Sequence, residues 1–274
     1  MKEKASKTLM YAFLTIIAAI NVVPILWMVV NSLKTDREYA ADPFALPAEM
    51  QWSNYAQAWK KANLGLYFGN SLLITIVAVL CTVFFAAMAS YFLARVSFRG
   101  NKLLHSFFLF GMLIPVHATL VPLFLIMQKL SLLNTRFSLI LVYTAVHIPI
   151  TIYILTSFMK GLPKQMEEAA VIDGSTVFRT FFQIILPMSL PALATVFILN
   201  VLYNWNEYLI SLVLIRKQQF FTVPIGIAAF SDTETSYPTT QMAALILVLI
   251  PTVIFFTAMQ KYLVKGMVAG AVKG

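Results

Sequence analysis

The sequence EEAAVIDGSTVFRTFFQIILP, from Glu167 to Pro187, lies between two apolar segments that are each long enough to cross a membrane. It is too long for a tight turn between two helices, and it is helix-prone rather than loop-like. Both the fold and the function depend on one question: why a membrane protein would keep a small, alanine-rich, acidic helix outside the lipid.

The composition of the chain indicates a membrane protein. Of its 274 residues, 60% are hydrophobic and 11% are charged, and the mean hydropathy is +0.81. A soluble domain carries about 25% charged residues, so lipid is the solvent that this composition predicts. The net charge of +9 comes from short basic clusters between apolar runs, which indicates membrane topology rather than nucleic-acid binding. Cys81 is the only cysteine, so the chain can form no intrachain disulfide.

Six apolar runs have about the 20 residues that a helix needs to cross the hydrocarbon layer. They cover residues 9–31, 71–94, 103–128, 138–159, 189–215 and 241–263. We therefore predict an all-α integral membrane protein with six transmembrane helices, in a single transmembrane domain over residues 1–274. The first run is longer than the apolar region of a signal peptide and is expected to remain uncleaved. Three segments join or follow the spans: an outer segment of short surface helices at 32–70, a loop at 160–188, and a tail at 264–274.

The distribution of basic residues predicts the orientation of the spans. Six spans put both termini on the same side of the membrane. With the termini inside, twelve Lys and Arg residues fall in inner segments and eight in outer ones. Because cytoplasmic loops carry the excess of basic residues, we predict that both termini and the Glu167–Pro187 stretch face the cytoplasm.

The Glu167–Pro187 stretch is predicted to fold as two helices joined at a glycine. Pro163 can open the first helix, whose one face is formed at spacings of i, i+3, i+4 and i+7 by Met166, Ala169, Ala170 and Asp173. Gly174 suits the left-handed position that ends a helix, and Ser175 is a suitable N-cap for the next one. The second helix would be held down by Phe178, Phe181, Phe182 and Ile185. The first helix would present small residues outward, either to the groove of a partner protein or to the lipid headgroups.

The spacing of four elements in this stretch matches a known pattern. Glu168-Ala169-Ala170 is followed after three residues by Gly174, and after nine more by Ile184-Ile185-Leu186-Pro187. This resembles the EAA loop of the membrane subunits of bacterial ABC importers. Three further motifs resemble the carbohydrate-uptake branch of that family, namely Trp52-Ser53-Asn54-Tyr55, Asn70-Ser71 and Asn204-Trp205-Asn206-Glu207. The tail from Lys261 to Gly274 resembles the end of the maltose-type second permease.

The resemblance implies a role for the stretch. Residues 166–173 would be a coupling helix that sits in a cleft on a separate ATPase. The implied coupling residues are Glu168, Ala169, Ala170, Asp173 and Gly174. In this picture Glu168 pairs with a basic or polar group of the ATPase, the two alanines allow close approach, and Gly174 sets the bend. The tail, with Lys273 and Gly274, would reach between the ATPase subunits.

The resemblance also implies the partners. They are a second homologous permease, an ATPase dimer, an extracellular or periplasmic sugar-binding protein and membrane lipid, in the cytoplasmic membrane of a bacterium or archaeon. No segment matches the nucleotide-binding motif G-x-x-x-x-G-K-[ST]. The chain is therefore expected to bind no cofactor, with ATP and Mg on the partner ATPase. The distribution of its basic residues predicts no nucleic-acid partner.

The fifth apolar run carries an unusual set of polar residues. Asn200, Asn204, Glu207 and Ser211 follow the spacing i, i+4, i+7, i+11, which predicts one helical face. Amides and carboxylates can bind sugar hydroxyls, and Tyr203 and Trp205 can cover apolar sugar faces. The candidates for the substrate pathway are Asn200, Asn204, Trp205, Asn206, Glu207 and Ser211. The alternative is that these polar groups join helix to helix inside the bundle.

Two other classes of function compete with an ABC permease. A secondary transporter needs a coupling-ion site, but Glu207 is the only acid inside a predicted span, and the sequence shows no inverted repeat. An intramembrane enzyme needs a catalytic set, which we do not find. His117 and His147 are isolated and form no metal site by spacing. We therefore predict a non-catalytic permease subunit.

Overall fold

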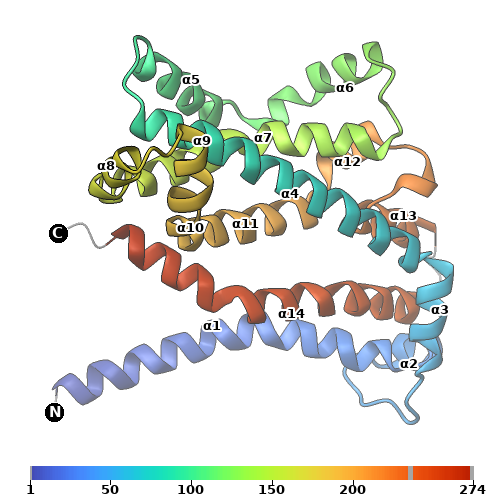
Figure 1. The fold of residues 1–274 in the computed structure, drawn as a ribbon. Helices are drawn as coiled ribbons and strands as arrows, with labels where there is room; N and C mark the ends of the chain where they lie inside the picture. Colours follow the sequence, from blue (N-terminus) through green and yellow to red (C-terminus); the bar gives the residue numbers. More distant parts are fainter. Residues whose placement is uncertain (1, 234–236, 272–274) are drawn as a thin grey trace. The chain divides into compact units, whose positions relative to one another are not determined.

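The computed structural model describes residues 2–233 and 237–271, with the side chains of residues 6–231 and 237–260. All the regular elements in these residues are helices (Figure 1). Four of them are long and apolar enough to cross a membrane. They are α1 (Lys2–Ser32), α4 (Leu64–Arg95), α7 (Arg136–Lys160) and α14 (Pro238–Ala271). The predicted all-α membrane fold is confirmed.

Two further candidate spans are bent pairs of helices. In the first, α5 (Asn101–Leu113) meets η1 (Val116–Thr119) and α6 (Leu120–Lys129) at 90°. In the second, the segment Val177–Met188 meets α11 (Leu190–Trp205) at 76°. The described residues thus hold four spans, or up to six if each bent pair counts as one. Pro115 explains the first break, because proline has no N–H and forces the preceding residue, Ile114, into an extended conformation.

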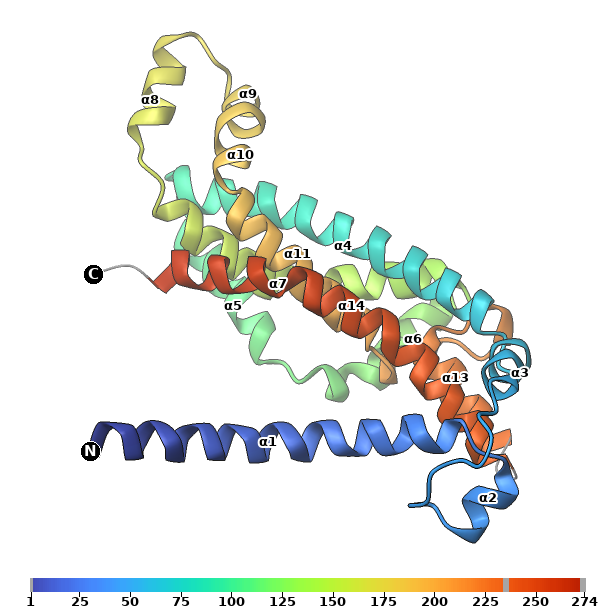
Figure 2. The same cartoon turned by 90° about the horizontal axis from the view of Figure 1, so that it is seen from below.

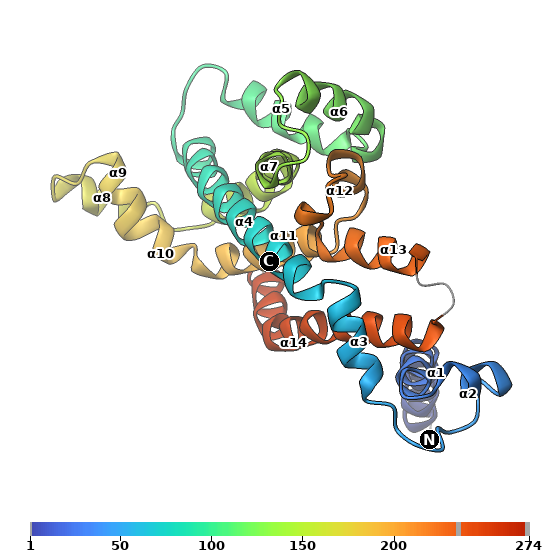
Figure 3. The same ribbon diagram turned by 90° about the vertical axis from the view of Figure 1, so that its right-hand side faces the viewer.

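The contacts divide the chain into two compact units, which we describe separately. The larger unit comprises residues 66–225 and 254–274. In it, α7 packs against α5 and against α11, and α4 lies beside them (Figure 1). Ala78, Ala86 and Ala87 are fully buried on α4, and their small side chains allow neighbouring helices to approach closely. Figure 3 shows α6 next to α12 (Leu209–Leu214), and the two helices are in contact.

The Asn70-Ser71 motif fastens a loop of the larger unit. The Asn70 amide nitrogen donates to the carbonyl oxygens of Gln219 and Phe221 at 3.0 and 2.9 Å, and its oxygen accepts from Arg136 Nε at 2.8 Å. The Ser71 hydroxyl accepts from the backbone N–H of Val223 at 2.8 Å. The motif therefore holds the short 3₁₀ helix η3 (Gln218–Phe220) and the loop around it.

The smaller unit comprises residues 1–65 and 226–253. It contains the short helices α2 (Asp36–Ala41) and α3 (Ser53–Lys61), as predicted for the segment after the first span, and most of α13 (Val223–Thr233). Helix α4 begins at Leu64, within the segment predicted for residues 32–70. Lys34 is buried and donates to the Asp42 carbonyl oxygen at 3.0 Å, while the Asn54 amide donates to the Ser32 and Lys34 carbonyl oxygens. These bonds fold the segment back onto the end of α1.

Candidate functional site

The first helix of the Glu167–Pro187 stretch is α8 (Gln165–Ile172), which ends in the manner predicted. Gly174 has a φ of +76°, in the left-handed region. Its N–H donates to the Val171 carbonyl oxygen at 3.0 Å, and the Ser175 N–H donates to the Ala170 carbonyl oxygen at 2.8 Å. This pair of bonds is a Schellman motif, which satisfies the last carbonyl groups of a helix. The glycine therefore fixes the direction in which the chain leaves α8.

The second helix differs from the prediction in its start and in its contacts. Its N-cap is Thr176 rather than Ser175, since the Thr176 hydroxyl accepts from the Arg179 N–H while Ser175 serves the end of α8. The helix runs as α9 (Val177–Thr180), a π-helical turn from Phe181 to Ile185, and α10 (Leu186–Met188). Phe181 and Ile185 are buried, whereas the other two residues predicted to hold the helix down, Phe178 and Phe182, are exposed.

The outward surface of α8 is less dominated by small residues than predicted. Ala170 is 6% exposed and faces into the chain, whereas Glu168, Ala169 and Asp173 are exposed. Large apolar side chains are also exposed on this helix, namely Met166, Val171 and Ile172. Ala170 is buried because the chain folds back on α8 immediately after Gly174. The helix therefore offers a mixed surface, with one small residue and three large apolar ones.

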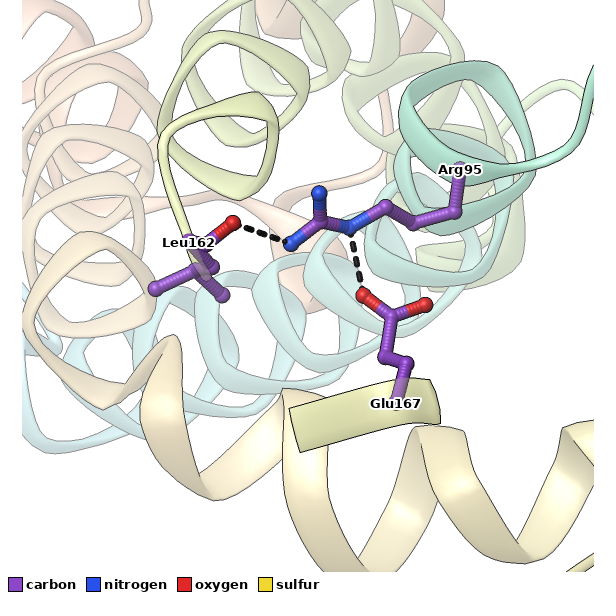
Figure 4. A network of polar contacts seen from close by, with 3 residues as sticks. All are labelled: Arg95, Leu162 and Glu167. Atoms are coloured by element: carbon purple, nitrogen blue, oxygen red, sulfur yellow. Dashed lines mark hydrogen bonds and ion pairs between the residues drawn. The ribbon is translucent and has the colours of Figure 1, made fainter. Parts of the chain in front are cut away.

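An ion pair holds α8 to the end of α4 (Figure 4). Arg95 Nε lies 2.6 Å from Glu167 Oε1, and Arg95 Nη2 donates to the Leu162 carbonyl oxygen at 2.8 Å. The two side chains are only 4% and 17% exposed. Burial raises the pKa of Glu167, and the Arg95 guanidinium opposes that shift. This pair was not predicted from the sequence; the available signals were a basic residue at the end of a span and an acid in the first turn of α8.

The two helices of the stretch stand out from the body of the larger unit. Figure 2 shows α8 and α9 projecting beyond the ends of α4, α7 and α11. Few other elements cover them, and five large apolar side chains are exposed: Met166, Val171, Ile172, Val177 and Phe178. The arrangement is a rigidly capped helical hairpin with an apolar, accessible surface.

The second candidate site lies where the fifth apolar run is interrupted. Helix α11 ends at Trp205, α12 begins at Leu209, and residues 206–208 are not helical. Glu207 lies in this break. Its carboxylate accepts from the backbone N–H of Ile210 at 2.6 Å and of Ser211 at 3.0 Å, and from the Tyr143 hydroxyl at 2.8 Å. The predicted single helical face is therefore wrong, because Glu207 caps α12 and joins it to α7.

Two other members of the predicted face also join helices. The Asn200 amide, 2% exposed, donates to the Thr151 hydroxyl of α7 at 3.0 Å and to the Val196 carbonyl oxygen at 2.7 Å. The Ser211 hydroxyl shares a hydrogen bond with the Tyr143 hydroxyl. For Asn200, Glu207 and Ser211 the geometry favours the alternative in which polar groups join helix to helix.

The remaining candidates lie around an aromatic pair. Tyr203 is 55% exposed and stacks on the His147 imidazole, with 5.4 Å between ring centroids and 17° between planes. Asn204 is buried, and neither of its amide atoms has a hydrogen-bond partner of good geometry among the described residues, although His147 lies beside it. The Trp205 and Phe68 rings lie 6.0 Å apart between centroids, with 35° between their planes. Asn206 is exposed and donates to the Leu202 carbonyl oxygen.

The other predicted site residues give no contacts to report. Lys273 and Gly274 lie outside the described residues. His117 is exposed at the bend between α5 and α6, and His147 lies within α7. Within the part of the chain that the structure describes, no three His, Cys, Asp or Glu side chains come together in a way that could hold a metal ion.

Comparison with known proteins identifies the family to which these features belong. The model of the binding-protein-dependent transport system inner membrane component family matches residues 83–269, which include α8, Gly174 and the interrupted fifth run. The chain belongs to this family. The EAA-type spacing thus lies within the matched region of an inner-membrane transport component.

Several curated members of the family are similar over nearly the whole chain. The diacetylchitobiose uptake system permease protein NgcG of Streptomyces coelicolor is 37% identical over 92% of this chain and 84% of that protein. The arabinooligosaccharides transport system permease protein AraQ of Halalkalibacterium halodurans is 35% identical over the full length of both. The trehalose/maltose transport system permease protein MalG of Thermococcus litoralis is 33% identical, again over both full lengths. The expected resemblance to carbohydrate-uptake permeases is confirmed.

The fold matches a solved ABC importer. A chain of a bacterial ABC transporter involved in the import of the acidic polysaccharide alginate aligns with a TM-score of 0.84, covering 96% of this chain and 98% of that one. The identity is 22%, so the likeness shows the fold alone. The helical membrane fold that the composition predicts is therefore also found in a solved transporter chain.

Proposed function

We propose that this chain is a permease subunit of an ATP-driven carbohydrate importer, in which it forms half of the translocation pathway. Membership of the family supports a transport role, and the named relatives above carry diacetylchitobiose, arabinooligosaccharides and trehalose or maltose. All of these are carbohydrates. The chain itself would be non-catalytic, with ATP and Mg bound by its ATPase partners.

The α8–Gly174–α9 hairpin is the observation that carries the proposal. Its helix is capped at Gly174 and anchored to α4 through Arg95 and Glu167, so it can transmit force as a rigid element. Exposed Met166, Val171 and Ile172 supply apolar area for docking to a protein, and exposed Glu168 supplies a charge for pairing. A close approach would occur at Ala169, since Ala170 is buried in the chain.

The proposed assembly contains four kinds of partner. They are a second homologous permease, an ATPase dimer, an external sugar-binding protein and the lipid of a bacterial or archaeal cytoplasmic membrane. A second solved ABC importer chain aligns at 17% identity with a TM-score of 0.63, and its description names a complex with an alginate pentasaccharide-bound periplasmic protein. With α8 on the ATPase side, both termini are cytoplasmic and the binding protein docks on the opposite face.

The docking role of α8 can be tested at Ala169. Changing Ala169→Trp places a bulky ring on the exposed surface without filling the chain's own core, so the permease should insert and pair normally. Overpacking a close contact costs about 1–3 kcal/mol, so the affinity for the ATPase, measured by co-purification, should fall about 5- to 150-fold. The matched variant Ala169→Ser keeps the residue small and should bind the ATPase like the wild type.

A different variant distinguishes docking from folding. Ala170→Trp changes a buried side chain and should lower the stability of the permease itself, whereas Ala169→Trp should not. If Ala169→Trp retained both ATPase binding and sugar-stimulated ATP hydrolysis, α8 would not be the coupling helix.

A further inference from the structure

The interruption of the fifth run is placed where lipid contact would be costly. The bent candidate span ends with α11 at Trp205, so the non-helical residues 206–208 follow it directly. Unpaired backbone groups in hydrocarbon cost several kcal/mol, and such irregular backbone is tolerated only if it is buried in protein or lines a water-filled cavity. Asn206 and Tyr208 are exposed in this chain. The exposed side chains of the break can therefore be reached by water or by another molecule.

One turn before the break, the exposed surface is aromatic. Tyr203 and Asn206 are three residues apart and share a face at the end of α11. The imidazole of His147, on α7, covers the Tyr203 ring at 5.4 Å with nearly parallel planes. More than half of Tyr203 is still exposed, so the ring face turned away from His147 is available for contact. The stack fixes the orientation of the ring, because two packed planes restrict its rotation.

Two asparagines follow Tyr203 within three residues of the chain. Asn206 uses its amide nitrogen for the Leu202 carbonyl oxygen at 2.8 Å, and its amide oxygen remains an acceptor. The Asn204 amide is buried and lies beside the His147 imidazole, so it helps to position the ring that backs Tyr203. A flat ring next to amides suits a ligand that has both an apolar face and many hydroxyls.

We propose that Tyr203, backed by His147, is a sugar-contact platform of this chain, with Asn206 accepting a hydroxyl hydrogen bond. A pyranose or furanose ring presents C–H groups on one face and hydroxyls at its rim, so it can stack on Tyr203 while its rim reaches the amide. This inference rests on the proposed function and extends it, because it assigns a direct sugar contact to this subunit. It also separates these residues from Asn200, Glu207 and Ser211, which join helices.

The test uses the whole complex, with its second permease, ATPase and binding protein, in proteoliposomes. Radiolabelled maltose, raffinose and diacetylchitobiose are the probes, and the ratio of sugar imported to ATP hydrolysed is measured. Tyr203→Leu should lower this ratio about five-fold, which corresponds to an aromatic contact of about 1 kcal/mol. Tyr203→Phe keeps the ring and should stay close to the wild type. Tyr153→Leu, a change at another exposed tyrosine of the bundle, should also behave like the wild type.

The outcomes separate the platform from a purely structural role. A Tyr203→Leu complex that assembles, keeps its basal ATPase activity and imports every probe at the wild-type ratio would overturn the proposal. If that variant does not assemble, Asn206→Ala decides, because this side chain is exposed and its hydrogen bond runs to Leu202 in the last turn of the helix that it follows: a reduced ratio supports the platform, and an unchanged ratio refutes it. A wild-type complex with no ATP-driven uptake of any probe would instead count against the proposed function.

Discussion

Arg95 and Glu167 show how two side chains set the position of the coupling helix. Each is largely withdrawn from water, so each depends on the other for its charge to be tolerated. Changing Arg95→Met should leave the Glu167 carboxyl buried without its partner, raise its pKa further and release α8 from α4. We expect the free energy of local opening of residues 160–176 to fall by about 3 kcal/mol, as seen by hydrogen exchange.

The double variant Arg95→Met/Glu167→Leu provides the control. Replacing a buried ion pair by apolar residues is often close to neutral, so the double variant should recover most of the protection that Arg95→Met loses. If the loss in the double variant equalled the sum of the losses in Arg95→Met and Glu167→Leu, the pair would not hold the helix.

Glu38 is a second residue whose charge has a structural effect, in the smaller unit. Hydrogen bonds from the Thr35 N–H and hydroxyl, and from the Ala48 N–H, lower the pKa of Glu38. A lowered folded-state pKa gives stability that is fully present above the ordinary carboxyl value of 4.5 and is lost as the pH falls through the folded value. Hydrogen-exchange protection at Ala48, corrected for the intrinsic rate, should therefore decrease on acidification. In Glu38→Gln this protection should not change over the same pH range; an equal loss in both would exclude Glu38 as its cause.

At the scale of single elements, Gly174 determines where α8 points. The left-handed conformation is costly for residues with a Cβ atom, and about 1–2 kcal/mol is typical. An added Cβ at Gly174 would meet no atom within 4 Å, so the backbone strain acts without a steric clash. Gly174→Val should weaken the Schellman motif and misdirect α8, lowering ATPase recruitment while leaving insertion intact. Gly174→Asn should do less harm, because asparagine tolerates this conformation. Equal ATPase binding by the Val and Asn variants would contradict this account.

Glu207 joins α12 to α7, so its effect is also at the scale of single elements. Its carboxylate accepts three hydrogen bonds. A glutamine at this position has only one acceptor oxygen, and its amide nitrogen would face N–H and O–H donors. Glu207→Gln should destabilise the assembled permease by about 1–3 kcal/mol, measured as a lower unfolding temperature. Tyr143→Phe should lose part of the same interaction, so the two changes should be less than additive. A stable Glu207→Gln complex with altered sugar preference would instead place Glu207 in the pathway.

On the scale of the whole molecule, the features predicted best from sequence were those set by local chemistry. The apolar runs predicted the membrane fold, and Pro163, the helical spacing from Met166 to Asp173 and Gly174 predicted the helix and its glycine cap. The interruption at 206–208 was missed, because the spacing of Asn200, Asn204 and Glu207 matches a continuous helix. Only the structure shows that Glu207 caps a new helix instead.

Contacts between distant segments were equally hidden from the sequence. The burial of Ala170 depends on the return of the chain after Gly174, and the Arg95–Glu167 pair joins positions on two different helices. The Tyr203–His147 stack likewise needs α11 and α7 to lie side by side. Periodicity identifies a face of one helix, but it does not identify the helix that the face contacts.

The most direct measurement of the central claim is sugar uptake by reconstituted proteoliposomes that contain this chain, its second permease, the ATPase subunits and the binding protein. The account predicts accumulation of a labelled oligosaccharide only when all components and ATP are present, and its loss when this chain alone is omitted. Uptake by the isolated chain without ATP, or unchanged uptake in its absence, would contradict the account.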